Sequence, residues 1–177
     1  MRYRTRTYIA ADWDNDRDVV DKLREWNNND HLSLDFSDAH DLTQARETSL
    51  YCSIKKSLVE RLKGSKTFVL IVGDHTKNLT KGKCCYCEHY NKYTEKCYNN
   101  NQIDMRSYIE FECERALYYK MKIIVIYKSN DFVDINKCPD VLRPKSMEDM
   151  KYHIPAYYSR GNKTYWNYEA IKNALED

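Results

Sequence analysis

The sequence predicts an α/β protein with a flavodoxin-like, doubly wound sheet of five parallel strands and helices on both faces. Short apolar runs alternate along the chain with stretches whose apolar residues recur every three to four positions. The most hydrophobic run, residues 67–72, is apolar at nearly every position, as in a strand buried on both faces. Such alternation gives parallel strands joined by right-handed crossovers, and the expected strand order is 2-1-3-4-5.

Each expected element has its own local pattern. The strands are expected at residues 5–11, 32–36, 67–72, 122–127 and 152–157. Helices are expected through residues 19–26, through residues 50–62 before Gly64, from residue 108 onward, and through residues 165–175. At 177 residues the chain is expected to form one domain, residues 1–177. A polar insert at about residues 77–102 and a C-terminal extension from about residue 130 complete this organisation.

The composition excludes several classes of partner. The 29 basic and 27 acidic residues are interleaved and leave a formal charge of only +2, so no nucleic-acid or membrane-binding surface is expected. No apolar run is long enough to span a bilayer, and the basic N-terminus lacks the apolar core of a secretory signal. We therefore expect a cytoplasmic protein whose seven cysteines are thiols or metal ligands.

In the expected strand order, a ligand crevice lies at the carboxyl ends of the first and third strands. The residues expected to border it are Asp12, Trp13, Asp14, Ser37, Asp38, His40, His75 and Thr76, and Tyr108 is also expected to contact the bound ligand. Two other interpretations of the acidic residues remain open. Asp14 or Asp16 can cap the first helix, or Asp12, Asp14, an acceptor Asp74 and Ser129 can form a receiver-like phosphoacceptor site, although no lysine stands in an obvious place after the fifth strand.

Several common mechanisms are excluded by missing motifs. The four glycines form neither a Rossmann nor a P-loop pattern, and there is no Gly-x-Ser-x-Gly elbow. A calcium loop at residues 12–23 is excluded because Arg17 replaces the turn glycine and Leu23 replaces the bidentate glutamate.

The insert contains a cluster of metal-binding residue types. Cys84 and Cys87 have Cys-x-x-Cys spacing, and His89 and Cys97 can complete a tetrahedral zinc site. Zinc would give shape to a polar segment with little core. The alternatives are free thiols in a loop, or a set that includes Cys85.

Glu112 stands in a helical pattern four residues after Tyr108 and four before Ala116. These positions share one helix face, so the carboxylate points toward the residues against which the helix packs. A carboxylate at such a position is either paired or functional.

Three segments together resemble the TIR-like domain family, in particular the bacterial branch of Thoeris-type antiphage defence. They are Ala10-Ala-Asp12-Trp-Asp14-Asn-Asp16-Arg, Gly73-Asp-His-Thr76 and Tyr108-Ile-Glu-Phe-Glu112-Cys-Glu-Arg-Ala116. The resemblance spans roughly residues 5–128, and tyrosine stands at 108 where the family usually has tryptophan.

The resemblance implies cleavage of the nicotinamide–ribose bond of NAD, with NAD as substrate and no cofactor required. It implies that Glu112 is the catalytic carboxylate, that Trp13 stacks on a base, and that Ser37 or Asp38 lines the opposite wall. A linear or cyclic ADP-ribose product would activate a downstream effector. Because many TIR-like domains only associate with one another, a non-catalytic interaction module remains the alternative.

Overall fold

The computed structural model describes residues 6–32, 34, 36, 50–97 and 102–177 of the chain. Its main sheet has five strands in the order β1-β2-β5-β6-β7. Their bounds are Arg6–Ala10 for β1, Ser65–Val72 for β2, Lys122–Asn130 for β5, His153–Arg160 for β6 and Lys163–Trp166 for β7. The first four strands pair in parallel, and β7 pairs with β6 in the antiparallel sense. The expected α/β class is therefore confirmed, with a sheet that is mostly parallel where five parallel strands were expected.

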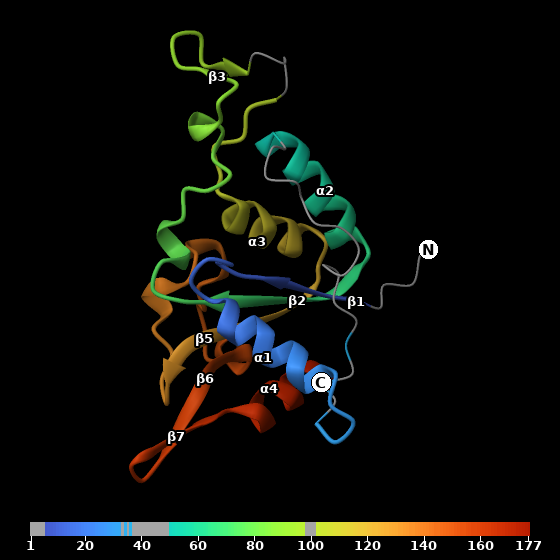
Figure 1. The fold of residues 1–177 in the computed structure, drawn as a ribbon, viewed down its shortest axis with the longest axis vertical. Helices are drawn as coiled ribbons and strands as arrows, with labels where there is room; N and C mark the ends of the chain where they lie inside the picture. Colours follow the sequence, from blue (N-terminus) through green and yellow to red (C-terminus); the bar gives the residue numbers. More distant parts are fainter. Residues whose placement is uncertain (1–5, 33, 35, 37–49, 98–101) are drawn as a thin grey trace.

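Four helices flank this sheet in the described part of the chain. They are α1 (Arg17–Asn27), α2 (Tyr51–Lys63), α3 (Tyr108–Tyr118) and α4 (Tyr168–Glu176). Helices α2 and α3 cover one face, and α1 and α4 cover the other (Figure 1). Short 3₁₀ turns lie at Thr76–Asn78, Cys84–Tyr86, Ile135–Lys137, Asp140–Leu142 and Asp149–Tyr152.

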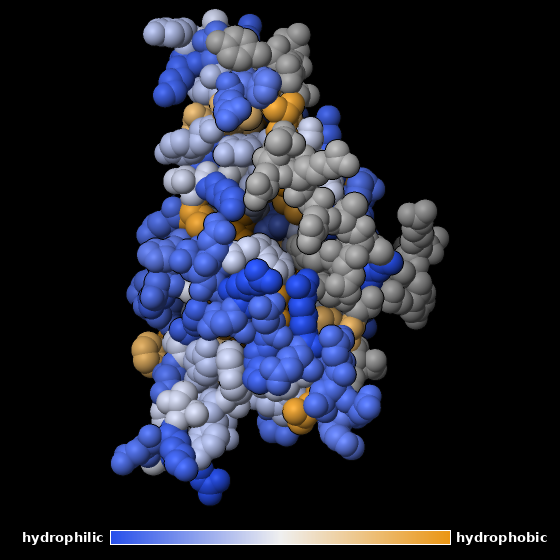
Figure 2. All heavy atoms as spheres, in the orientation of Figure 1, coloured by the Kyte–Doolittle hydropathy of each residue, from blue (hydrophilic) through white to orange (hydrophobic). Residues whose placement is uncertain are grey.

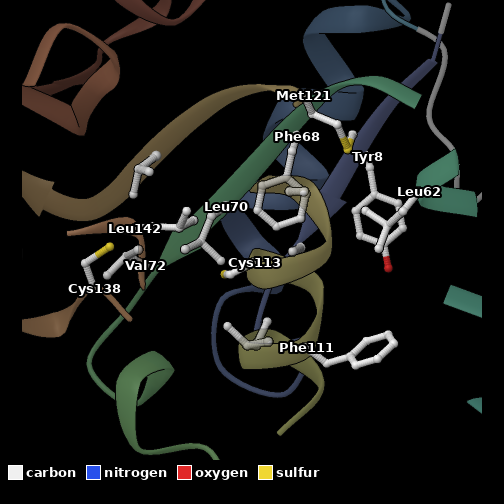
Figure 3. Close-up of a cluster of buried hydrophobic side chains, with 14 of the residues drawn as sticks. Tyr8, Leu62, Phe68, Leu70, Val72, Phe111, Cys113, Met121, Cys138 and Leu142 are labelled. Atoms are coloured by element: carbon white, nitrogen blue, oxygen red, sulfur yellow. The ribbon is translucent and has the colours of Figure 1, made fainter. Parts of the chain in front are cut away.

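Alternating side chains of the central strands supply a separate core on each face. Tyr8, Phe68 and Leu70 pack on the α2 and α3 side, whereas Ile9 and Val69 pack on the α1 and α4 side. This alternation follows from the two-residue period of a strand. Figure 3 shows Tyr8 and Phe68 in the first of these cores beside α3, where their rings stack at 5.8 Å. The sheet is thus buried on both faces, as its continuous apolar run predicts.

The C-terminal end of the sheet differs from the prediction. The expected helix at 165–175 begins at Tyr168, because β7 occupies the preceding residues. Gly161 is the first of two residues that join β6 to β7, and its φ of +62° is the left-handed value that a tight hairpin turn needs there. The sheet therefore ends in an antiparallel strand.

The expected second strand lies partly outside the described residues. Leu34 is 2% exposed and packs in the α1 core, but neither it nor Phe36 is assigned to a strand. The side chain of Asn27 fixes Phe36 instead, donating to its carbonyl at 2.8 Å and accepting from its N–H at 2.9 Å. This part of the chain is therefore held against the end of α1.

The polar insert extends away from the sheet, beyond α2 and α3 (Figure 1). It contains a small hairpin of β3 (Tyr90–Asn91) and β4 (Lys96–Cys97). The face of the molecule seen in Figure 2 is mostly hydrophilic, with small, separate hydrophobic areas. In the described residues no helix is long and apolar enough to cross a membrane.

Candidate functional site

The loop after β1 folds around the carboxylate of Asp12. This side chain is 5% exposed; one oxygen accepts from the backbone N–H of Asp14 at 3.2 Å and the other from the Asn15 amide at 2.7 Å. Such bonds from an aspartate to the residues just after it are typical of a tight turn. Asp12 is therefore engaged in shaping the loop.

Asp16 connects this loop to the end of β2. The Thr76 hydroxyl accepts from the N–H of Gly73 at 2.8 Å and lies 3.5 Å from Asp16 Oδ2. A Cβ on Gly73 would stand 2.1 Å from Asp16 Oδ1, so only glycine allows this close approach. Because β1 and β2 are neighbours, their carboxyl ends bring Asp16 and Thr76 together, as the predicted crevice requires.

Asp16 is shielded from water, and charged side chains lie close to its carboxylate. Burial raises the pKa of its carboxyl to about 6; Lys128 lowers it, and Asp12 and Asp18 add smaller upward effects. Lys128 Nζ lies 3.8 Å from Asp16 Oδ1 and 2.7 Å from Asp18 Oδ1. Sequence analysis missed this lysine; its signal was its place near the carboxyl end of β5, the strand next to β2.

Asp16 stands at the N-cap position of α1 but makes no side-chain capping bond there. The proposed cap by Asp14 or Asp16 is thus not seen in the hydrogen bonds of α1. Asp74 is exposed and its carboxylate lies 2.6 Å from Lys137, which lowers its pKa. The receiver-like interpretation remains a prediction. Lys128 approaches the acids of the β1 loop, and a different lysine, Lys137, pairs with Asp74.

Other expected contact residues surround the same edge of the sheet. Trp13 is 36% exposed and the Arg24 guanidinium lies over its ring, 5.2 Å from the centroid. Asp14 forms an ion pair with Lys81 at 3.2 Å, and His75 is exposed. Ser37, Asp38 and His40 lie outside the described residues. Their roles remain predictions.

Glu112 is buried against β1. It is 6% exposed, and its Oε1 accepts a 2.5 Å hydrogen bond from the hydroxyl of Tyr8. Ala116, one turn further along α3, is fully buried. The predicted inward-facing side of this helix is therefore confirmed. Tyr8 was not expected as a partner, because a bond between residues 104 positions apart leaves no local pattern.

Tyr108 packs at the start of α3, one turn before Glu112. Its hydroxyl is buried and has no hydrogen-bond partner among the described residues, and burial raises its pKa. A Cβ on Gly82 would lie 2.6 Å from its ring, and Gly82 has φ of +98°. Its ring also meets Tyr51 edge-on at 5.7 Å. This tyrosine therefore joins the insert, α2 and α3.

The expected site residues form two groups. Asp12 and Thr76 gather at the end of the sheet, whereas Glu112 contacts Tyr8, four residues before Asp12. In an extended chain that spacing corresponds to roughly 13 Å. A hollow of about 730 Å³ on the α2 and α3 side is lined partly by Lys55, Arg106 and Glu110, but not by Glu112 or by the β1 loop.

A much smaller cavity lies in the insert. Its lining includes the four residues expected to bind metal, Cys84, Cys87, His89 and Cys97. The sequence therefore identified side chains that the fold brings to one place. In the described part of the chain, however, no three metal-binding side chains already stand in an arrangement that could hold an ion.

In a comparison with protein families, residues 8–81 match the family described as Thoeris protein ThsB, TIR-like domain. The resemblance found in the sequence is confirmed over this segment. The matched segment contains the β1 loop, β2 and Thr76, and it ends before α3 and Glu112. A comparison with curated proteins found no match.

Proposed function

We propose that this chain, whose residues 8–81 match the TIR-like domain of the Thoeris protein ThsB, is a signalling protein of antiphage defence that cleaves NAD at the nicotinamide–ribose bond. The observation that supports the chemistry is the buried carboxylate of Glu112, bound by the Tyr8 hydroxyl at 2.5 Å. A buried carboxylate needs a hydrogen-bond partner, and Tyr8 provides one; a charged group held in this way inside the fold is a candidate for function.

The reaction needs a fixed negative charge beside the ribose. As the C–N bond breaks, nicotinamide leaves as a neutral molecule with the bonding electron pair, and positive charge develops on the ribosyl carbon. A carboxylate such as Glu112 stabilises that charge, as in glycoside cleavage. Tyr8 holds one carboxylate oxygen in place, so less reorganisation is needed in the transition state. Attack by water gives ADP-ribose, and attack by the adenine ring of the same molecule gives a cyclic product.

The product then acts as a signal. In this proposal it binds a downstream effector, and the protein associates with itself through its TIR-like surfaces. The proposal places the protein in the cytoplasm, where NAD is available.

The first experiment replaces Glu112 with glutamine, which keeps the shape of the side chain and removes its charge. Mass spectrometry measures the release of nicotinamide from NAD. We expect the rate of release to fall by a factor on the order of 100 or more, the usual effect of removing one electrostatic contact from a transition state. Glu114→Gln is the matched control: Glu114 lies on the same helix, its side chain is 45% exposed, and it pairs with Arg106. Equal activity in Glu112→Gln and the native protein would remove Glu112 from the mechanism.

The Tyr8→Phe variant distinguishes the role of the hydroxyl, which positions Glu112, from the role of the ring, which packs in the core. The variant keeps the ring that stacks on Phe68 and loses only the hydroxyl that binds Glu112. We expect kcat to fall by roughly tenfold, about the worth of one hydrogen bond to a charged group, with little change in KM. A variant that unfolds more easily but retains its kcat would show that the bond is structural only.

The second candidate is a non-catalytic interaction module. It is favoured by the position of Glu112, which lies among core residues and lines neither of the two hollows described above. This module would release no nicotinamide even at high protein concentration, but would self-associate in sedimentation experiments.

A further inference from the structure

The insert contains a tight turn followed by a hairpin. Cys84 begins a 3₁₀ turn, and the N–H of Cys87 donates to its carbonyl at 3.0 Å. The chain then enters the hairpin, in which Tyr90 pairs with Cys97. Cys97 therefore returns beside the residue that follows His89, close to the turn that carries the first two cysteines.

These four side chains line one small cavity. Cys84, Cys87, His89 and Cys97 contribute to its wall from the insert, and Cys52 contributes from α2. The cavity has a volume of about 10 Å³, which is enough for one water-sized body and too small for an organic ligand. Cys85 does not line it. The cavity is thus of the right size for a single ion and is rich in sulfur.

The sulfur of Cys84 already has a supporting contact. The backbone N–H of Asp104 donates to its Sγ at 3.2 Å, and the N–H of Cys84 donates to the Asp104 carbonyl at 3.1 Å. A hydrogen bond from the backbone to sulfur stabilises the thiolate, the form of cysteine that binds metal.

Apolar packing does not explain how the insert keeps its shape. Between Cys84 and Cys97, only Cys84 is buried, and the aromatic side chains Tyr86 and Tyr93 are 61% and 100% exposed. A segment without a core needs another source of stability, such as a disulfide or a metal ion. None of the seven cysteines forms a disulfide in the structure, and a metal ion bound by the cysteines would supply that stability.

We propose that Cys84, Cys87, His89 and Cys97 bind one structural Zn²⁺ that shapes the insert. Three thiols and one imidazole form a closed tetrahedral site, the usual composition of structural zinc centres. Binding releases three thiol protons and leaves a complex with one net negative charge. Because the side chains do not yet converge in the described residues, zinc binding turns them inward around a cavity that they already share.

The experiment measures zinc in the full chain, purified without a histidine tag. We expect elemental analysis to find about one zinc per chain, and Cys87→Ser, Cys97→Ser and His89→Ala each to lose most of it. Cys85→Ser is the matched control in the same turn, and Cys52→Ser tests the nearby thiol of α2. Both should retain zinc.

Cobalt provides a second readout that does not depend on activity. Co²⁺ added to the metal-free protein should give the visible absorption of a tetrahedral site with sulfur ligands, and added Zn²⁺ should displace it. The proposal is overturned if the chain binds neither metal, if zinc remains in the Cys87 and Cys97 variants, or if mass spectrometry finds these cysteines in a disulfide. Retention of zinc by His89→Ala would overturn the assigned ligand set.

Discussion

At the scale of single residues, Asp16 shows how burial changes acid–base behaviour. Its carboxyl has a pKa near 6 in the folded protein and an ordinary value of 3.8, so between these values the folded state binds more protons than the unfolded state. Stability contributed by this group is therefore present at low pH and is lost as the pH rises toward and through 6.

Asp16→Asn should remove this dependence. Two pKa units correspond to on the order of 3 kcal/mol, so we expect the native protein to lose about 2 to 3 kcal/mol relative to the variant between pH 4 and 7.5. Urea unfolding at several pH values measures this difference. Asp14→Asn, at an exposed position in the same loop, should track the native protein; parallel curves for the native protein and Asp16→Asn would contradict the assignment.

At the same scale, the sequence predicted the burial of Glu112 but not that of Asp16. Glu112 was predictable because helical spacing places it with Ala116 on an inward face. Asp16 was not, since its burial depends on Gly73, which approaches only after β1 and β2 have paired. Lys128 was missed because it approaches Asp16 only when β5 is paired with β2.

At the scale of elements, α3 begins with a reciprocal cap. The Ser107 hydroxyl accepts from the N–H of Glu110 at 3.2 Å, and the Glu110 carboxylate accepts from the N–H of Ser107 at 2.6 Å. The Ser-x-x-Glu spacing is a known start signal that our sequence analysis did not use. This cap fixes the helix that carries Glu112.

Ser107→Ala should lower the free energy of unfolding by about 1 kcal/mol, because an N–H at the helix start loses its acceptor. Chemical denaturation measures the loss. Ser53→Ala, at an exposed position inside α2, should change stability by only a few tenths of a kcal/mol. Equal effects of the two substitutions would show that the cap contributes nothing.

The hairpin of β6 and β7 was the element that the sequence analysis placed wrongly. A glycine–asparagine pair at 161 and 162 between two aromatic-rich runs is a hairpin signal. The helical spacing of the following residues obscured it, so the helix was extended back to residue 165. Strand β7 forms by pairing with β6, and the periodicity of the sequence alone does not reveal this contact.

At the scale of the whole molecule, two cores share one sheet. Phe68 is fully buried between the Tyr8 ring and α3 (Figure 3). Phe68→Ala should cost about 3 to 5 kcal/mol, because it removes a large side chain from a closely packed core. Phe132→Ala is the control, since Phe132 is 65% exposed and should cost little. A loss below about 1 kcal/mol for Phe68→Ala in urea unfolding would mean that the core collapses around the gap.

The α/β class and the parallel pairing of the central strands followed from the sequence because buried parallel strands leave continuous apolar runs. The position of the insert did not, since its contacts with α2 and α3, such as that between Gly82 and the Tyr108 ring, join residues far apart in the sequence and leave no periodic spacing. The proximity of Cys84, Cys87, His89 and Cys97 was predictable from their spacing alone.

Lys55 of α2 reaches across to the segment that joins the insert to α3. Its side chain is 4% exposed, and its ammonium group binds the carbonyls of Asp104 and Arg106 at 3.2 and 2.6 Å and the Asp104 carboxylate at 3.3 Å. One side chain thus anchors both the return path of the insert and the approach to Ser107. Local opening at this anchor would expose the backbone amides of both regions together, so they would exchange hydrogen with solvent as a single unit.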